Sequence, residues 1–336
     1  ALFPEGTSHE ESKMKRLRTG PMRSVIAANS IATERGLPEP HLLPVGLHFR
    51  TSWHFRTDAW IEYGEPILLS EFIHTKENRN KLLSGEWVEA DAESVNALRD
   101  QVQDRLRPMT PDAESWDEHR AWHLIGHLRA QATKTPLDSW REEVLAARDI
   151  RKQIRDGNQT LNQMMNSAKS VASDLNDAGL DGRAFCSTGI RIPTLSEKLA
   201  IIPALLLAIF AFPLTTISSG LMILVGKILG DKTDEGLDAR TSYHILAGLL
   251  GPLLIWPIPT IIVTIIVMKI FSLSILPTLG ILLAMPLAFH ISNLVAMRAW
   301  DLHVISRDAR RLQRFSKTKQ GADAEAAAME ILAVLK

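Results

Sequence analysis

A long apolar block constrains the fold of this 336-residue chain more than any other feature. It runs from Leu199 to Met297 and is interrupted by one polar island from Lys227 to Tyr243. Most of the charge lies before this block, so the mean hydropathy of 0.00 averages over unlike parts. An apolar run of roughly 20 residues can cross a hydrocarbon core about 30 Å thick. The block therefore predicts an integral membrane protein with C-terminal membrane helices.

Three membrane segments are expected in this block, at residues 199–228, 244–268 and 272–297. The first carries Pro213 near its centre, and a proline removes a helix hydrogen bond and promotes a kink. Basic residues flank the block on both sides, and Lys and Arg concentrate on the cytoplasmic side of membranes. An even number of passages satisfies this tendency. We therefore expect a bent hairpin at 199–228 and two spans that cross and return, with three straight crossings as the alternative.

Residues 298–336 form a basic tail that we expect in the cytoplasm. Beside a membrane span, a basic cluster faces anionic lipid headgroups more often than nucleic acid. Membrane lipids are therefore expected partners, and nucleic acid is not. The single cysteine, Cys186, excludes an intramolecular disulfide framework and fits a reducing compartment.

Residues 71–198 are polar and read as a mostly helical cytoplasmic region. Apolar residues recur there with the spacing of amphipathic helices. The helices are expected at Ala90–Leu106, Asp112–Ala132, Leu137–Ile154 and Asn158–Leu180.

The N-terminal part carries sequence blocks in a distinctive order. Phe3 to His9 read FPEGTSH and are followed by LRTGPMR from Leu17 to Arg23. Further on, Leu42 to Leu47 read LLPVGL and Ala59 to Ile67 read AWIEYGEPI. Together these blocks resemble those of the glycerolipid acyltransferases, in the variant found in glycerol-3-phosphate and dihydroxyacetone-phosphate acyltransferases. The resemblance covers residues 1–70, the expected C-terminal part of the catalytic domain.

The fold class expected from this resemblance and from the residue pattern is α/β. Leu2 and Phe3 would end a strand, which places the FPEG turn at its carboxyl end, where open α/β sheets bind ligands. A helix is expected from Gly20 to Arg35, with strands at His41–Phe49 and Asp58–Tyr63. The first strand is a nearly continuous apolar run suited to a buried position. The chain thus reads as a partial acyltransferase α/β domain, followed by a helical region and C-terminal membrane helices.

The resemblance also implies an acceptor-binding site around the FPEG turn. There Glu5 would accept a hydrogen bond from the glycerol moiety, and Gly6 would let the backbone approach. A guanidinium binds phosphate bidentately, so Arg18 and Arg23 are the expected phosphate contacts. The expected substrate-binding residues are Glu5, Gly6, Thr7, Ser8, His9, Arg18 and Arg23, of which His9 either touches the substrate or stabilises the turn. The residues expected to shape the motifs are Phe3, Pro4, Pro44 and Gly46.

The activity implied by the resemblance is transfer of a fatty acyl group from acyl-CoA or acyl carrier protein to sn-glycerol-3-phosphate or dihydroxyacetone phosphate, in phospholipid synthesis. Lysophosphatidate as acceptor, or a non-catalytic membrane protein that retains the scaffold, are the alternatives. In the family, a His and an Asp separated by four residues carry the transfer, on the N-terminal side of the FPEG block. This sequence begins two residues before that block. We therefore expect no catalytic residue here, no acyl transfer by residues 1–336 alone, and no cofactor or metal.

Two histidine arrangements near the membrane segments are weaker candidates. His303 and Asp308 have the spacing of the family's catalytic pair but follow the apolar block. A polar face on a basic helix is the favoured interpretation there. His244 and His290 lie at or inside apolar segments, where a polar side chain is a functional hint, although positions near the ends allow it to reach the interface.

A third arrangement has the spacing of a metal site. His119, His123 and His127 recur every four residues, which places them along one stripe of a helix. The neighbouring Trp116 and Trp122 favour packing over zinc binding.

Overall fold

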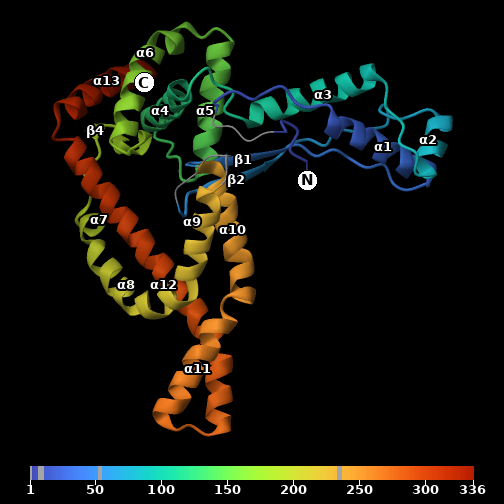
Figure 1. The fold of residues 1–336 in the computed structure, drawn as a ribbon. Helices are drawn as coiled ribbons and strands as arrows, with labels where there is room; N and C mark the ends of the chain where they lie inside the picture. The colour runs from blue at the N-terminus through green and yellow to red at the C-terminus, as the bar shows by residue number, and fades with distance from the viewer. Residues whose placement is uncertain (1, 7–10, 52–54, 233–236) are drawn as a thin grey trace. The chain divides into compact units, whose positions relative to one another are not determined.

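The computed structural model describes residues 2–6, 11–51, 55–232 and 237–336, and helices dominate it (Figure 1). The chain divides into two compact units. Unit 1 comprises residues 1–51, 56–173 and 327–336, and unit 2 comprises residues 52–55 and 174–326.

The helices of unit 1 lie close to the predicted ones, except that the helix Lys76–Leu83 was not predicted. They are α1 (Gly20–Glu34), α2 (Lys76–Leu83), α3 (Ala92–Leu106), α4 (Trp116–Thr133), α5 (Trp140–Arg155) and most of α6 (Gln159–Asp177), with a 3-10 turn at η1 (Arg107–Met109). Asp91, Ser115 and Ser139 precede α3, α4 and α5, and each accepts a hydrogen bond from the N–H three residues later. Such caps satisfy the first free donors of a helix, so the sequence sets these starts locally.

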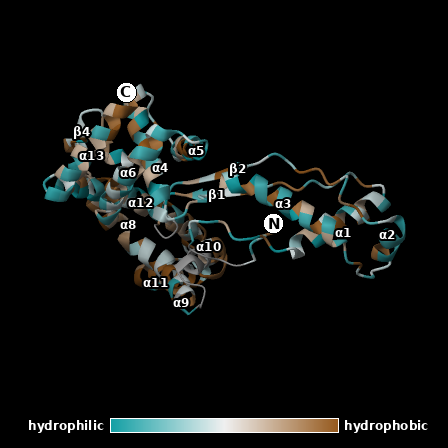
Figure 2. Cartoon of the chain, turned by 90° about the horizontal axis from the view of Figure 1, so that it is seen from above, coloured by the Kyte–Doolittle hydropathy of each residue, from teal (hydrophilic) through white to brown (hydrophobic). Residues whose placement is uncertain are grey.

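One apolar core joins α1 to α3. Met22 and Ile26 of α1 are buried with Leu98 and Val102 of α3 and with Ile67. Hydrophilic and hydrophobic residues alternate along α1, as expected for a helix with one buried face (Figure 2).

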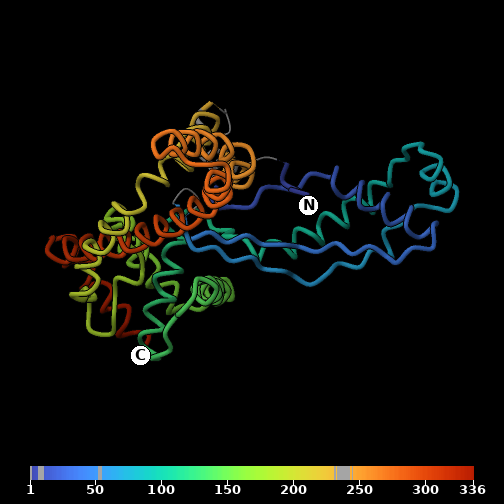
Figure 3. Tube along the Cα trace, turned by 90° about the horizontal axis from the view of Figure 1, so that it is seen from below, coloured from blue at the N-terminus to red at the C-terminus, as the bar shows by residue number. Residues whose placement is uncertain are grey.

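The sheet of unit 1 differs from the predicted one. Strands β1 (Val45–Phe49) and β2 (Ala59–Tyr63) pair antiparallel, with Leu47 opposite Ile61, and run side by side (Figure 3). Leu2 and Phe3 lie outside any strand, so the expected strand before the FPEG turn was wrong. In the described residues the remaining strands are the two-residue β3 (Phe185–Cys186) and β4 (Gly189–Ile190), and an α/β acyltransferase domain is not confirmed.

The expectation that the first strand is buried was also wrong. Val45, Leu47 and Phe49 are 40%, 53% and 51% exposed, because they share one face of a two-stranded sheet. Side chains alternate between the faces of a strand, and His48 lies on the other face. Trp140 of α5 donates its indole N–H to the carbonyl of His48 at 3.1 Å. The hairpin is therefore packed on one side only.

Two carboxylates, the buried Glu143 and the partly buried Glu62, lie among arginine and histidine side chains where β1 and β2 meet α4 and α5. Glu143 accepts from Arg50 Nη1 at 2.7 Å and faces His127 Nε2 at 3.0 Å. Glu62 accepts hydrogen bonds from both Nη atoms of Arg148, at 2.8 and 2.6 Å. Burial alone would raise the pKa of Glu143, but the hydrogen bonds from His127 and Arg50 hold this pKa below its usual value. Each carboxylate is thus kept charged by the groups that it cross-links.

Unit 2 contains the apolar block. Its helices are α7 (Leu195–Leu199), α8 (Ile201–Thr215), α9 (Leu221–Asp231), α10 (Leu237–Leu254), α11 (Pro257–Phe271) and α12 (Ile275–Phe315), with a 3-10 turn at η2 (Gly182–Ala184), a π-turn at η3 (Thr216–Gly220) and the first part of α13 (Lys319–Leu335). Helix α8 packs along α12, and α9 packs against α10 (Figure 1).

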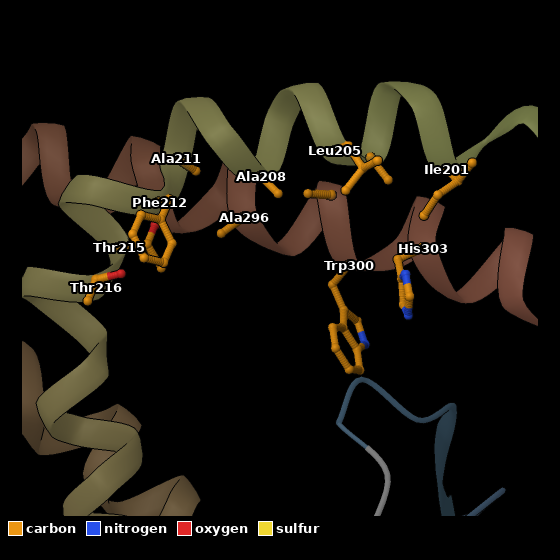
Figure 4. A pocket seen from close by; sticks show the side chains of 12 residues that line it. Ile201, Leu205, Ala208, Ala211, Phe212, Thr215, Thr216, Ala296, Trp300 and His303 are labelled. Atoms are coloured by element: carbon orange, nitrogen blue, oxygen red, sulfur yellow. The ribbon is translucent and has the colours of Figure 1, made fainter.

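The predicted bend near Pro213 is visible at the end of α8. The ribbon turns at Thr215 and Thr216, and the backbone continues through η3 into α9 (Figure 4). Proline lacks the N–H that a regular helix needs, and π-turns accompany such breaks. Side chains of α12 hold the turn, because Ser292 Oγ donates to the carbonyl of Ala211 at 2.9 Å and lies 2.9 Å from Thr215 Oγ1.

Two continuous helical stretches of the described residues have the length and apolar character of membrane spans, Leu195–Gly230 and Ile275–Phe315. A third candidate is the broken pair Ile245–Leu254 and Pro257–Phe271, whose halves meet at 43°. These helices are compatible with a membrane protein. By the rise of 1.5 Å per residue, the 41 residues of α12 extend about 61 Å, twice the hydrocarbon thickness, so this helix continues well beyond the membrane.

The buried carboxylates give a stability prediction. Glu143→Ala leaves Arg50 and His127 without their shared partner, so we expect the free energy of unfolding to fall by about 3 kcal/mol. Asp149→Ala is the control, because the Asp149 carboxylate is 48% exposed in its pair with Arg129 and its loss should cost less than about 1 kcal/mol. Chemical unfolding of the protein in detergent, followed by tryptophan fluorescence, measures both. Equal costs for the two variants would contradict the cross-linking role.

Candidate functional site

The FPEG block forms a tight turn that is pinned to the chain at Arg18. The N–H of Gly6 donates to the carbonyl of Phe3 at 3.1 Å, and Gly6 has φ +67°, a conformation that favours glycine. The N–H of Arg18 donates to the carbonyl of Pro4 at 2.7 Å. Two blocks that are separate in the sequence are thereby brought together.

The side chain of Arg18 lies directly against this turn. A Cβ added to Gly6 would be 2.9 Å from Arg18 Cγ, so a larger residue would displace the arginine. Arg18 is exposed, and in the described part of the chain its guanidinium makes no ion pair. An arginine held in this way keeps its donors available for an anion.

Helix α1 begins two residues after Arg18. Its first turn has no acidic residue, and Thr19 provides no side-chain cap. A Cβ on Gly20 would have no atom within 4 Å, so the space beside the start of the helix is open. The N-terminus of a helix carries partial positive charge and free N–H groups, which suit a phosphate or carboxylate. Arg18 and the start of α1 therefore lie together beside the FPEG turn, in an arrangement whose chemistry suits an anion.

The other expected site residues have different positions. Arg23 lies on α1 and pairs with Glu89, Nη1 to Oε2 at 3.4 Å, so part of its charge is already compensated. Phe3 is 80% exposed and holds the turn through its carbonyl. Thr7, Ser8 and His9 lie outside the described residues.

Pro44 and Gly46 are buried near η1. The carbonyl of Pro44 accepts from the N–H of Gly64 at 2.9 Å. A Cβ on Gly46 would be 2.9 Å from Met109 Cβ and 3.1 Å from the Met109 carbonyl oxygen. Pro44 thus joins the end of the hairpin, and the close approach of Met109 leaves no room for a side chain at Gly46.

The three regularly spaced histidines of α4 contact rings and a carboxylate, and the rings of His119 and His123 also contact each other, with centroids 4.7 Å apart. His119 sits among rings, with its centroid 5.5 Å from that of Trp116 and 6.3 Å from that of Trp122. His123 stacks on Trp140 at 5.1 Å, and His127 faces Glu143. Within the described ranges no group of three His, Cys, Asp or Glu side chains could hold a metal ion. The stripe packs the helix against its neighbours.

The pair His303 and Asp308 does not form a catalytic dyad. Both lie on α12, where five residues correspond to a rotation of about 140°, so their side chains leave the helix on different sides. Asp308 Oδ1 accepts from Arg307 at 3.0 Å. His290 is exposed on α12, and the side chain of His244 lies outside the described part of the chain.

The sequence analysis missed an apolar groove of about 360 Å³ between α8 and α12 (Figure 4). Small side chains open it, with Ala204 and Ala208 on α8 and Ala296 on α12. Trp300 and His303 lie towards one end, and Thr215 and Thr216 lie at the other. At roughly 30 Å³ for each water-sized group, the groove has room for one alkyl chain. The groove could have been predicted from the alanines that recur every three or four residues along α8, because such small side chains leave space beside a neighbouring helix.

Comparison with known proteins gives a distant relationship. No family model matches the chain, and no solved structure does. A Schizosaccharomyces pombe protein named uncharacterized acyltransferase C1718.04 is 26% identical over 118 residues, which are 35% of this chain. The match spans only 16% of the length of that relative. It supports a relationship to acyltransferases in general.

The histidine stripe gives a pH prediction. Burial among the rings, together with the charges of Arg151 and Arg120, lowers the pKa of His119 from 6.5 to about 4. The unfolded chain therefore binds a proton at a higher pH than the folded chain does. Above pH 6.5 the titration of His119 does not lower the free energy of unfolding. Between pH 6.5 and 4, protonation of His119 in the unfolded chain lowers this free energy by up to about 1.4 kcal/mol per pH unit.

His119→Gln removes this titration. We expect the drop in unfolding free energy between pH 7 and pH 5 to be smaller in the variant than in the wild type, as measured by denaturant unfolding in detergent. His48 and His74, whose pKa values are also lowered by burial, remain in both proteins and cancel in the comparison. Identical pH slopes would contradict the prediction, because they would show that folding does not change the proton binding of His119.

Proposed function

We propose that this chain belongs to a membrane-bound acyltransferase and binds its acceptor, sn-glycerol-3-phosphate, at the FPEG turn. The observation that carries the proposal is the contact between Gly6 and Arg18 at the start of α1. It joins a carboxylate, a guanidinium and a helix N-terminus in one exposed corner. The distant match to an acyltransferase is the second support.

The chemistry of the acceptor fits this corner. Arg18 donates two parallel hydrogen bonds to the phosphate, and the N–H groups at the start of α1 add further donors. Glu5 accepts a hydrogen bond from a glycerol hydroxyl. Acyl-CoA or acyl carrier protein supplies the acyl group as co-substrate. We assign acceptor binding, and no proton transfer, to these residues.

Other acceptors share the same phosphate. Dihydroxyacetone phosphate differs by a ketone in place of a hydroxyl, and lysophosphatidate carries an acyl chain. A non-catalytic membrane protein with the same scaffold would still bind the anion. Assays of acyl transfer by the natural full-length protein, with each acceptor and palmitoyl-CoA, separate these possibilities from glycerol-3-phosphate transfer.

The acceptor corner predicts the effect of one substitution. Arg18→Gln should weaken the binding of glycerol-3-phosphate by at least about tenfold, because a hydrogen bond to a charged group contributes about 1.5–3 kcal/mol. Arg35→Gln is the matched control. Arg35 is exposed at the opposite end of α1, and its substitution removes the same charge. Isothermal titration calorimetry with the protein in detergent measures both.

Two outcomes would contradict the assignment. One is equal affinity of the wild type for glycerol and glycerol-3-phosphate, which would exclude phosphate recognition. The other is an equal loss of affinity in Arg18→Gln and Arg35→Gln, which would reduce the effect to net charge.

We further propose that the acceptor corner, the polar island 227–243 and the tail after Arg298 all face the cytoplasm. Basic residues on both sides of the apolar block support this arrangement. Single cysteines at Lys232 and Lys319, in a Cys186→Ser background, test it. In sealed right-side-out vesicles both should resist a membrane-impermeant thiol reagent until the membrane is opened. Labelling at both Lys232 and Lys319 before the membrane is opened would support three straight crossings instead.

A further inference from the structure

A second cavity lies among α10, α11 and α12, apart from the groove between α8 and α12. It measures about 300 Å³ and is lined by apolar and proline side chains together with Trp256 and Thr260. The prolines that line this cavity include Pro252 and Pro286. It belongs wholly to unit 2 and involves no residue of the acceptor corner.

Two polar atoms at this cavity are buried without a partner. In the part of the chain that the structure describes, neither Trp256 Nε1 nor Thr260 Oγ1 makes a hydrogen bond. Thr260 is only 4% exposed. Thr264, one turn further on, donates its hydroxyl to the carbonyl of Thr260 at 2.7 Å, in the usual way for a membrane helix. Thr260 does not satisfy its own hydroxyl in this way.

Such unsatisfied groups are costly in hydrocarbon. Without water, each unpaired polar group costs several kcal/mol. Trp256 and Thr260 are four residues apart at the start of α11, so they lie on the same side of the helix. The Trp256 ring is also held edge-on against the fully buried Phe289 of α12, with centroids 5.8 Å apart. The two residues therefore line one cavity, and each carries a buried donor that has no partner among the described residues.

The cavity selects the chemistry of its ligand. An indole N–H can only donate, and a hydroxyl can donate as well, so the pair suits one oxygen with two lone pairs, as in a carbonyl. The described lining residues are neutral, which disfavours a carboxylate or phosphate. A lone water is a poor match, because the volume equals about ten waters at roughly 30 Å³ each, and apolar walls stay dry.

The depth of the cavity selects among neutral lipids. Pro286 lies eleven residues after the start of α12, or about 16 Å along the helix, near the middle of a core about 30 Å thick. A charged headgroup holds a phospholipid at the interface, whereas an uncharged glyceride can reach this depth. We propose that the cavity binds the ester carbonyl of a neutral acyl glyceride, with Trp256 Nε1 and Thr260 Oγ1 as its two donors.

Two matched probes test this site on the whole chain in nanodiscs. One is a monoacylglycerol with a photoreactive diazirine in its acyl chain, and the other is the ether analogue, which lacks only the carbonyl oxygen. The ester should label peptides that contain residues 252–261 or 282–286, and it should bind about tenfold more tightly than the ether. Equal labelling of this region by ester and ether would overturn the proposal, since the carbonyl would then not be recognised.

Substitution of the donors provides the second arm. Trp256→Phe combined with Thr260→Val keeps the apolar walls and removes both donors, and loss of unsatisfied groups should leave the melting temperature unchanged or raised. This double variant should lose the ester preference. Thr264→Val, which removes a hydroxyl that is already bonded, should keep it. Retention of the preference in the double variant would show that other groups bind the ester.

Discussion

The constraint on which the C-terminal half depends is the pairing of polar groups within an apolar block whose helices are long enough to span a membrane. Each polar group there needs a partner from the protein. At the bend after α8 this requirement is met, because Ser292 bonds the carbonyl of Ala211 and Ser219 Oγ donates to Asn293 at 2.9 Å. At the start of α11 it is not met by the described residues, since none of them pairs with the donors of Trp256 and Thr260. The same rule thus explains a structural joint in one place and points to a ligand site in the other.

Unit 1 depends on a different balance, between burial and charge. Glu62 and Glu143 stay ionised inside the unit only because arginine and histidine donors surround them. These contacts attach a two-stranded hairpin to α4 and α5 and compensate for its small packed area. Arg18, beside the FPEG turn, has the opposite arrangement, because it is exposed. The arginines bound to Glu62 and Glu143 therefore support the fold, whereas Arg18 faces solvent.

The helices were predictable because their signals are local. Caps such as Asp91 and Ser139, apolar spacing and the length of the apolar block need no knowledge of distant residues. The expected strand at Leu2 and Phe3 failed, because strand formation depends on a partner that a local pattern does not specify. The burial expected for Val45–Phe49 failed for the same reason, since an apolar run does not say whether both faces of its sheet are covered.

The sequence by itself determined the apolar block with helices long enough to span a membrane, the starts of the capped helices and the residue types of the FPEG block. Only the tertiary structure decided that Arg18 rests on Gly6, that Arg23 is paired with Glu89, and that His123 stacks on Trp140 while His127 faces Glu143. It also decided that Trp256 and Thr260 line one cavity. The physical reason is that periodicity and caps act over a few residues, whereas charge pairing and cavities depend on side chains brought together from distant parts of the chain.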